Sequence, residues 1–524
     1  MIRRSYLPGG SGLTEAAPPR PLDIRRAKWA IVLTTLFLAT RALNVWFWRI
    51  PSVDFVQNDV SYYGYWLWCL LGDGAGDANC QAALANGGVM AEYPLPAVWF
   101  LQFVYTLGAP VPGWLPWFLL LAAIATLSAY VTLLTRGRRR AARFSAAGGA
   151  LATIIVWFLV ALPGRSQAFV TWTPLFACTM LALDAVVAIL LFRHGSVRAC
   201  LFWVLYIGAC GPIVWFRFDI LTAAAVALAC LWVVRHPRVS GALVGLGAGI
   251  KLWPALLILP MSTPSPLRPG PSRSRLLGFV VMGAVLGGLS LLVGGWARSV
   301  SPLSWQSARG LQMESVPATP IHVLRTWTSD PSWTIALSEY NAIELFGPAT
   351  GHLLRVSTLL TVGSILLTLA LTWRLARNVD GGSRHQPQAV ILCVLAVVLA
   401  TIVANKTLST QYVQWLAGPL AACLALPGER WLRRPLVVVA SLLLAVAVLT
   451  QYTYPWGTLG IMALPNGEGI ETAALVGRNL LLVLLAGLVA GLAWRATRSS
   501  GPGTAPELST RGAASSDDTH SENL

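Results

Sequence analysis

The chain has 524 residues, of which 56% are hydrophobic and only 11% are charged, a balance that excludes an ordinary soluble globular protein. Its net charge of +17 raises the question of nucleic acid, but the arginines cluster in short loops between apolar runs. There they set the orientation of membrane segments and contact anionic headgroups. We therefore expect an integral membrane protein and exclude nucleic acid as a partner.

The two ends of the chain differ from the apolar body between them. Residues 1–26 carry arginine, proline and glycine, and the run that follows has no small-residue cleavage site, so we expect a retained first helix. Residues 497–524 are rich in Ser, Gly, Thr and Asp and bury too little apolar surface to fold. We divide the chain into a cytosolic disordered basic tail (1–26), a polytopic membrane domain (27–496) and a second cytosolic disordered tail (497–524).

Apolar runs of roughly 20 residues, the length that crosses a bilayer, recur along the membrane domain. The expected spans are 28–48, 114–135, 145–163, 174–193, 199–216, 218–235, 276–296, 352–376, 388–404, 411–427, 434–450 and 472–494. This topology places the arginine-rich loops and both termini in the cytosol. It leaves two long outer loops, 49–113 and 297–351. Arginine far outnumbers lysine, as in GC-rich bacterial genomes, so we expect a bacterial plasma membrane.

The first outer loop combines acidic and aromatic residues, and from Ile50 onward it has no Lys, Arg or His. Asp59 and Tyr63 open a run that suits an interfacial helix, and helical spacing puts them on one face. Asp59 either caps this helix or serves as a general base, because desolvation and nearby cations set the pKa of a carboxylate beside lipid. If Asp59 is only the cap, Asp54 takes its place.

The same loop continues with a second short apolar stretch. Glu92 and Tyr93 open it and it ends near Leu107; we expect it to be interfacial, because a true span would reverse the side of every later loop. Cys69 and Cys80 both face the outside, where a disulfide persists. The spacing leaves open whether they are bonded or free.

Residues 240–260 are long enough to cross the membrane but have basic loops at both ends. We expect a re-entrant segment, broken within Gly249-Ile250-Lys251-Leu252-Trp253-Pro254, because proline removes a helix hydrogen bond. Non-helical backbone at that depth is tolerated only inside protein or beside a watery cavity. Three glycines at four-residue spacing allow a close helix contact in this segment: Gly241, Gly245 and Gly249.

Several charged residues lie in or beside the expected spans. Lys251 at the re-entrant tip costs about 2.5–3.5 kcal/mol if unpaired, so we expect a partner or a polar cavity, with snorkelling to the interface as the alternative. Arg217 and Asp219 lie at an outer turn and either face the same cavity or anchor the interface. Asp184 lies mid-span and must be paired or protonated, and we expect a structural role.

Two further groups of polar residues fall near the outer face. Lys406, Gln411 and Tyr412 belong to an unusually polar span opening, Asn405 to Trp415, and such groups are costly to bury unless they meet a ligand or each other; headgroup anchorage is the alternative for Lys406. In the second outer loop, His322 and Arg325 share a face if that stretch is helical. The cysteines and histidines show no metal-ligand spacing, and we expect neither a metal nor a cofactor.

The combination of motifs resembles a known class of enzymes. The motifs are Asp59-x-x-x-Tyr63, Tyr93-Pro94, Arg217-Phe218-Asp219, the Gly249–Pro254 segment and the Asn405–Trp415 segment. In this order they resemble the membrane-embedded C-type glycosyltransferases, and most closely the actinobacterial polyprenyl-phosphate-mannose-dependent α-mannosyltransferases. The family commonly has Tyr-Pro-Pro-Leu where this chain has Tyr93-Pro94-Leu95-Pro96.

The resemblance implies the all-α C-type glycosyltransferase fold, with about 12 transmembrane helices, a re-entrant broken helix and interfacial helices on the outer face. It also implies a reaction and a set of site residues. It implies transfer of mannose, with inversion, from a polyprenyl-phosphate-mannose donor to a cell-envelope glycolipid or glycan on the extracytoplasmic face. Asp59 is then the catalytic base, and Arg217, Lys251 and Lys406 stabilise the departing phosphate. The implied substrate-binding residues are Tyr63, Glu92, Tyr93, Arg217, Asp219, Lys251, His322, Arg325, Lys406, Gln411 and Tyr412. The alternatives are a transporter or lipid flippase, which a broken helix also suits, and a transferase using another polyprenyl-phosphate sugar.

Overall fold

The computed structural model of the protein describes residues 24–71, 73–85, 89–265, 267–378, 386–426 and 428–498. Nearly all of the two expected tails, 1–26 and 497–524, lies outside these residues. The regular structure in the described part is helical apart from one antiparallel hairpin, in which β1 (Thr334–Leu337) pairs with β2 (Ile343–Phe346). The prediction of an all-α polytopic membrane protein is confirmed.

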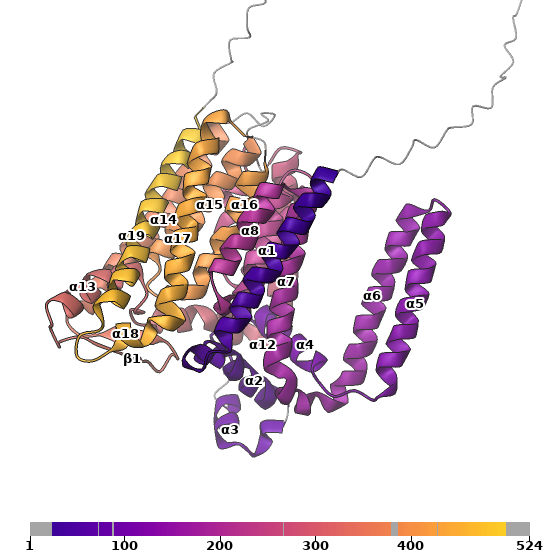
Figure 1. Ribbon diagram of the computed structural model, residues 1–524, viewed down its shortest axis with the longest axis horizontal. Helices are drawn as coiled ribbons and strands as arrows, with labels where there is room; N and C mark the ends of the chain where they lie inside the picture. Colours follow the sequence, from indigo (N-terminus) through magenta and orange to yellow (C-terminus); the bar gives the residue numbers. More distant parts are fainter. Residues whose placement is uncertain are drawn as a thin grey trace, which may run out of the picture.

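Nine helices in the described residues are long and apolar enough to cross a membrane, and each coincides with an expected span. They are α1 (Ile24–Trp48), α5 (Trp114–Thr135), α6 (Arg139–Ala161), α7 (Trp172–His194), α12 (Pro271–Ala308), α14 (Thr350–Asn378), α15 (Gln386–Ala404), α17 (Arg433–Gln451) and α19 (Gly469–Ala496). Figure 1 shows most of them side by side in one bundle.

The other three expected spans contain shorter helices. They are α8 (Val197–Ala209), α9 (Asp219–Leu231) and α16 (Ala417–Ala425), the last preceded by the 3-10 helix η7 (Thr410–Leu416). These helices are short yet deeply buried, and α16 packs on both α8 and α9. Gly418 of α16 makes the close approach possible, because a Cβ there would lie 2.5 Å from Ala227 Cα.

A buried ion pair joins three helices of the bundle. Arg41 of α1 lies 2.8 Å from Asp184 of α7, and the Trp203 indole of α8 donates a hydrogen bond of 2.8 Å to the same carboxylate. Both charged side chains are almost completely buried, where an unpaired charge is costly. The structure therefore supplies the partner that Asp184 requires, and the expected structural role is consistent with this contact.

Helices α5 and α6 stand apart from the bundle as a hairpin (Figure 1). They pack mainly on each other, and α6 meets the rest of the chain through α4 (Leu95–Leu107) and the 3-10 helix η3 (Leu162–Thr171). Large apolar side chains are exposed along both helices, among them Trp117 of α5 and Leu151 of α6. Such a surface suits contact with lipid tails rather than water.

Residues 237–261 enter the bundle and return, as expected for the re-entrant segment. Helix α10 (Pro237–Ile250) ends at extended backbone at Lys251 (φ −143°, ψ 134°), and the chain returns as η5 (Trp253–Leu257) and α11 (Ile258–Met261). Arg275 donates hydrogen bonds to the carbonyls of Val233, before the segment, and Met261, at its end. The two ends of the segment therefore lie close together, beside Arg275. The returning half is mostly a 3-10 helix.

The glycines of α10 form the close helix contact that their spacing predicts. A Cβ at Gly241 would overlap the backbone of Arg275 in α12, and one at Gly249 would lie 2.6 Å from Leu286 in the same helix. Helix α12 is itself interrupted at Gly295, whose φ of 67° favours glycine. The part after Gly295 belongs to the second expected outer loop.

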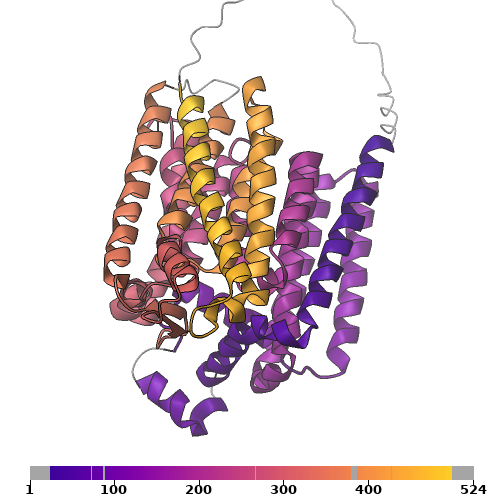
Figure 2. The same cartoon turned by 60° about the vertical axis from the view of Figure 1, so that its left-hand side comes forward.

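The two expected outer loops meet at one end of the molecule, which we call the loop end. The first loop contributes α2 (Asn58–Leu70), α3 (Ala78–Ala85) and α4, and the second contributes α13 (Thr319–Trp327) and the β1–β2 hairpin. In Figure 1 and Figure 2 this end lies opposite the start of α1 and the end of α19, and α18 (Thr458–Met462) lies at it as well. With only 13 residues, α4 is too short for a span, which favours the interfacial alternative.

Candidate functional site

A cavity of about 770 Å³ lies at the loop end, within the size range of small-ligand sites. Segments far apart in the chain line it, from within residues 55–66, 92–94, 217–219, 251–253, 302–314, 337–343 and 401–415, together with Tyr454. Nine of the predicted site residues are on the lining: Asp59, Tyr63, Glu92, Tyr93, Arg217, Asp219, Lys251, Gln411 and Tyr412. The fold thus brings most of the predicted residues to one place.

Asp59 forms an ion pair with Arg217 on the cavity wall. Asp59 Oδ2 lies 2.7 Å from Arg217 Nε; the Asp59 side chain is 30% exposed and that of Arg217 is 8% exposed. The guanidinium is held in place because Nη1 also donates to the carbonyls of Val56 (3.2 Å) and Phe216 (2.9 Å). This contact joins the first loop to the turn before α9.

The capping alternative for Asp59 does not match the geometry. The N-cap position of α2 is Gln57, where no side-chain cap bond forms, and Asp59 lies within the first helical turn. The substitute residue, Asp54, is exposed in the 3-10 helix η1 (Pro51–Gln57) and is not on the cavity lining. Asp59 is therefore the better placed of the two carboxylates.

Lys251 finds its partner at the start of α9. Its Nζ lies 2.7 Å from Asp219 Oδ1, and the same oxygen accepts a hydrogen bond of 2.9 Å from the Trp415 indole. The ammonium also lies 4.9 Å from the Tyr412 ring centroid and 5.3 Å from that of Phe218, distances at which an aromatic face attracts a cation. Asp219 and the rings therefore offset the desolvation of Lys251, and snorkelling is not needed.

Aromatic rings form much of the wall between these ion pairs. Tyr63 is buried, and its ring contacts Tyr93 and Phe218, with centroids 5.7 Å apart in both pairs. Tyr412 stacks on Trp415 at 4.1 Å, and Trp415 stacks on Trp253 at 4.6 Å. Rings at these separations pack favourably beyond their buried area, so the wall is well supported.

Two further predicted residues are held by hydrogen bonds on the lining. The Tyr62 hydroxyl donates to Glu92 Oε1 at 2.6 Å. Burial raises the pKa of Glu92 above its usual range, and the bond from Tyr62 acts against that shift. Ser409 Oγ donates to Gln411 Oε1 at 2.6 Å. The Glu92 carboxylate oxygen and the Gln411 amide oxygen therefore both accept hydrogen bonds from other lining residues.

Three predicted residues lie off the lining. His322 and Arg325 do share α13, but both are completely buried. The His322 Nε2 lies 2.6 Å from the Met313 carbonyl, and Arg325 donates to the carbonyls of Ile461 and Ala463. Lys406 Nζ donates to the carbonyls of Ser307 and Arg309. These contacts are with the protein's own backbone, so we no longer include the three residues in the proposed site.

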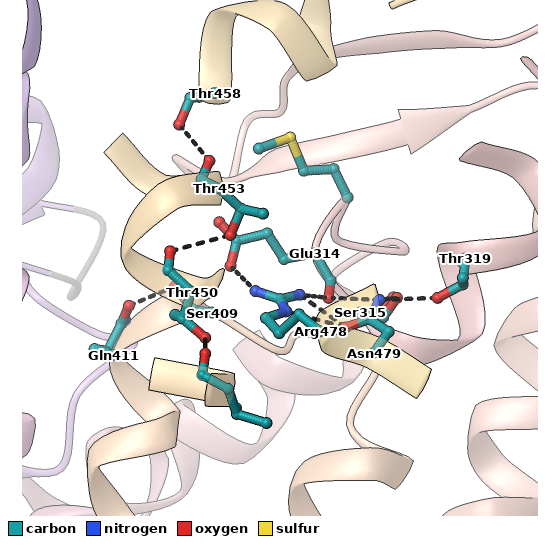
Figure 3. A network of polar contacts seen from close by, with 12 residues as sticks. Glu314, Ser315, Thr319, Ser409, Gln411, Thr450, Thr453, Thr458, Arg478 and Asn479 are labelled. Atoms are coloured by element: carbon teal, nitrogen blue, oxygen red, sulfur yellow. Dashed lines mark hydrogen bonds and ion pairs between the residues drawn. The ribbon is translucent and has the colours of Figure 1, made fainter. Parts of the chain in front are cut away.

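Glu314 is a lining residue that the sequence reasoning missed. It forms a buried ion pair with Arg478 of α19, at 3.3 Å, within the polar network that Figure 3 shows. The neighbouring Asn479 donates to Thr319 Oγ1 at 2.8 Å. Burial raises the pKa of Glu314, and the Arg478 charge opposes that shift. An arginine inside an apolar run requires a partner, but spacing alone does not identify Glu314.

A disulfide joins two helices of the first expected outer loop. Cys69, near the end of α2, is bonded to Cys80 of α3, with their Cα atoms 5.5 Å apart. The spacing in the sequence left open whether these two cysteines are bonded or free, and the structure shows them bonded. It fastens α3 to the helix that carries Asp59.

The middle of the chain is similar to a family of transferases. Residues 152–404 match glycosyltransferase family 87. The matched part runs from within α6 to the end of α15, so it includes Arg217, Asp219 and Lys251 but not Asp59. No curated protein and no solved structure matches the chain. The family match supports a membrane glycosyltransferase.

Proposed function

We propose that the protein transfers mannose from polyprenyl-phosphate-mannose to a cell-envelope glycolipid or glycan, with Asp59 as the general base. The observation that carries this proposal is the position of the Asp59 carboxylate. It faces a cavity at the loop end, is oriented by Arg217, and keeps 30% of its side chain exposed. The family match supports the reaction class, and the motif resemblance favours the mannose donor.

The proposed reaction is a single displacement with inversion. The acceptor hydroxyl oxygen attacks the anomeric carbon and gives its proton to Asp59, while the bond from that carbon to the phosphate oxygen breaks. The lipid phosphate leaves with the bonding electron pair. A base positioned in this way contributes roughly 10²- to 10⁴-fold to a rate. Arg217 is then a positioning residue, since it fixes the carboxylate.

The cavity wall offers apolar and aromatic surfaces that suit a lipid-linked sugar. Leu252, beside Lys251, is an exposed apolar residue on the lining, and we assign it to the first isoprene units. Trp305 and Tyr340 meet edge to face, with ring centroids 5.4 Å apart, on the wall formed by the second loop. Aromatic faces with a few polar neighbours are typical of specific small-ligand sites, so we assign this pair to sugar binding.

Incubation with a labelled donor tests the proposal. Membranes containing the wild-type protein should convert radiolabelled polyprenyl-phosphate-mannose into a labelled glycolipid or glycan, and membranes containing Asp59→Asn should not. Transfer from the arabinose or glucose donor instead would identify another sugar. Movement of the donor across the membrane without any covalent product would overturn the proposal and favour the flippase alternative.

A further inference from the structure

The cations on the cavity wall differ in whether they already have a carboxylate partner. In the described part of the chain the lining contains three: Arg217, Lys251 and Arg309. Arg217 and Lys251 each lie 2.7 Å from a carboxylate oxygen. No carboxylate of the described residues lies within ion-pair distance of Arg309. Among the cations that the structure describes on the lining, Arg309 is therefore the one without a carboxylate ion-pair partner, and it is free to pair with an anionic ligand.

The hydrogen-bonding capacity of Arg309 is also largely unused. Its Nη2 donates to Gln312 Oε1 at 3.3 Å, while its Nε is buried and has no hydrogen-bond partner among the described residues. A buried donor without a partner costs about 1–3 kcal/mol. Within the described residues the guanidinium donates a single hydrogen bond, the one to Gln312, so its remaining terminal N–H groups favour an oxyanion ligand.

The backbone around Arg309 is fixed on both sides. Lys406 donates from Nζ to the carbonyls of Ser307 and Arg309. The backbone N–H of Gln312 in turn donates to the backbone carbonyl of Lys406 at 2.9 Å. The Gly310 amide donates to Glu344 Oε1 at 3.1 Å. Arg309 thus projects from a restrained segment at the end of α12, and Lys406 serves to position it.

We propose that Arg309 binds the phosphate of the lipid-linked donor, an inference that rests on the proposed function. A guanidinium presents paired N–H groups that match phosphate oxygens. Lys251 is the weaker candidate, because the Asp219 carboxylate 2.7 Å away already offsets its charge, whereas an ion-pair partner for Arg309 is absent among the described residues. As the anomeric bond breaks, the phosphate gains negative charge, and a fixed cation beside it favours that step.

The test compares Arg309→Gln with Arg309→Lys and with a matched control, Arg355→Gln. Arg355 is an exposed cation on α14 that is not on the cavity lining. Three constants are measured in each detergent-solubilised variant: the donor KM, the acceptor KM and the inhibition constant of sugar-free undecaprenyl phosphate. Arg309→Gln should raise the donor KM and the inhibition constant roughly ten- to a hundredfold, the loss expected for charge-assisted hydrogen bonds, with the acceptor KM unchanged. Arg309→Lys should restore part of the affinity, and Arg355→Gln should match the wild type.

Three results would count against the inference. An unchanged inhibition constant in a folded Arg309→Gln variant would overturn it, and so would a change confined to the acceptor KM. If Arg309→Gln does not fold, Arg309→Lys decides, because a guanidinium that binds two phosphate oxygens is not fully replaced by an ammonium; wild-type affinity in that variant would overturn the inference. A wild-type protein that transfers no sugar from the donor would instead overturn the proposed function.

Discussion

Asp59 Oδ2 and Arg217 Nε lie 2.7 Å apart, joining the first expected outer loop to the turn that begins α9. The two residues belong to separate motifs of the sequence, and their contact places both motifs on the same wall of the cavity. Since Arg217 is nearly buried and also bonded to two backbone carbonyls, Asp59 has a defined orientation toward the cavity.

Asp59→Asn should reduce sugar transfer by about a hundredfold or more, because the amide keeps the size of the side chain but cannot accept the hydroxyl proton. The rate per folded protein, with folding checked by gel filtration in detergent, measures the effect. Asp54→Asn is the matched control, since Asp54 is exposed and off the lining, and it should keep nearly normal transfer. Near-normal transfer by Asp59→Asn would defeat the assignment.

Lys251 and Asp219 should show strong energetic coupling. Removing either charge alone leaves the other buried without its partner, a change that costs about 3–5 kcal/mol for buried pairs. Lys251→Gln and Asp219→Asn should therefore each lower the melting temperature by more than half of the decrease that the double variant shows. Thermal unfolding of all four proteins in one detergent measures this. Purely additive shifts would show that the contact contributes little.

Cysteine labelling should reveal which side of the membrane the loop end occupies. In a Cys178→Ser background, a membrane-impermeant maleimide applied to intact cells should label Pro331→Cys but neither Arg140→Cys nor Arg268→Cys. Both arginine sites should react once the membrane is opened. External labelling of Arg268→Cys would contradict a re-entrant path for residues 237–261, because the basic loop after α11 would then lie outside.

His322 should make the protein sensitive to acid. Burial, with smaller effects of the nearby Arg325 and Arg478 charges, lowers the pKa of His322 to about 4, against about 6.5 in an unfolded chain. Between these values the unfolded state binds a proton that the folded state does not, so stability falls as the pH drops from about 6.5 to about 4, by up to about 3 kcal/mol. Melting temperatures across that range should fall less steeply in His322→Gln. An equally steep fall would contradict this account.

Physical chemistry alone predicted which residues need partners but not which partners they have. A charge within an apolar run is costly unless paired, and this argument selected Asp184 and Lys251 from the sequence. Their partners are Arg41 and Asp219, and each pairing depends on which helices are neighbours. A single sequence carries no local pattern for that adjacency, because the contacts form between helices distant in the chain.

The amino-acid pattern by itself determined the all-helical membrane architecture, the two long loops and the break at Gly249–Pro254. Each of these follows from local rules: the length of apolar runs, the distribution of arginine and the missing hydrogen bond of proline. Only the tertiary structure decided which polar residues face the cavity. Lys406 and Arg309 are both cations near the loop end, yet Lys406 bonds to backbone carbonyls while Arg309 lines the cavity. The reason is that a buried backbone carbonyl also needs a hydrogen-bond donor. Packing between distant segments decides whether a given cation donates to such a carbonyl or remains on the cavity wall.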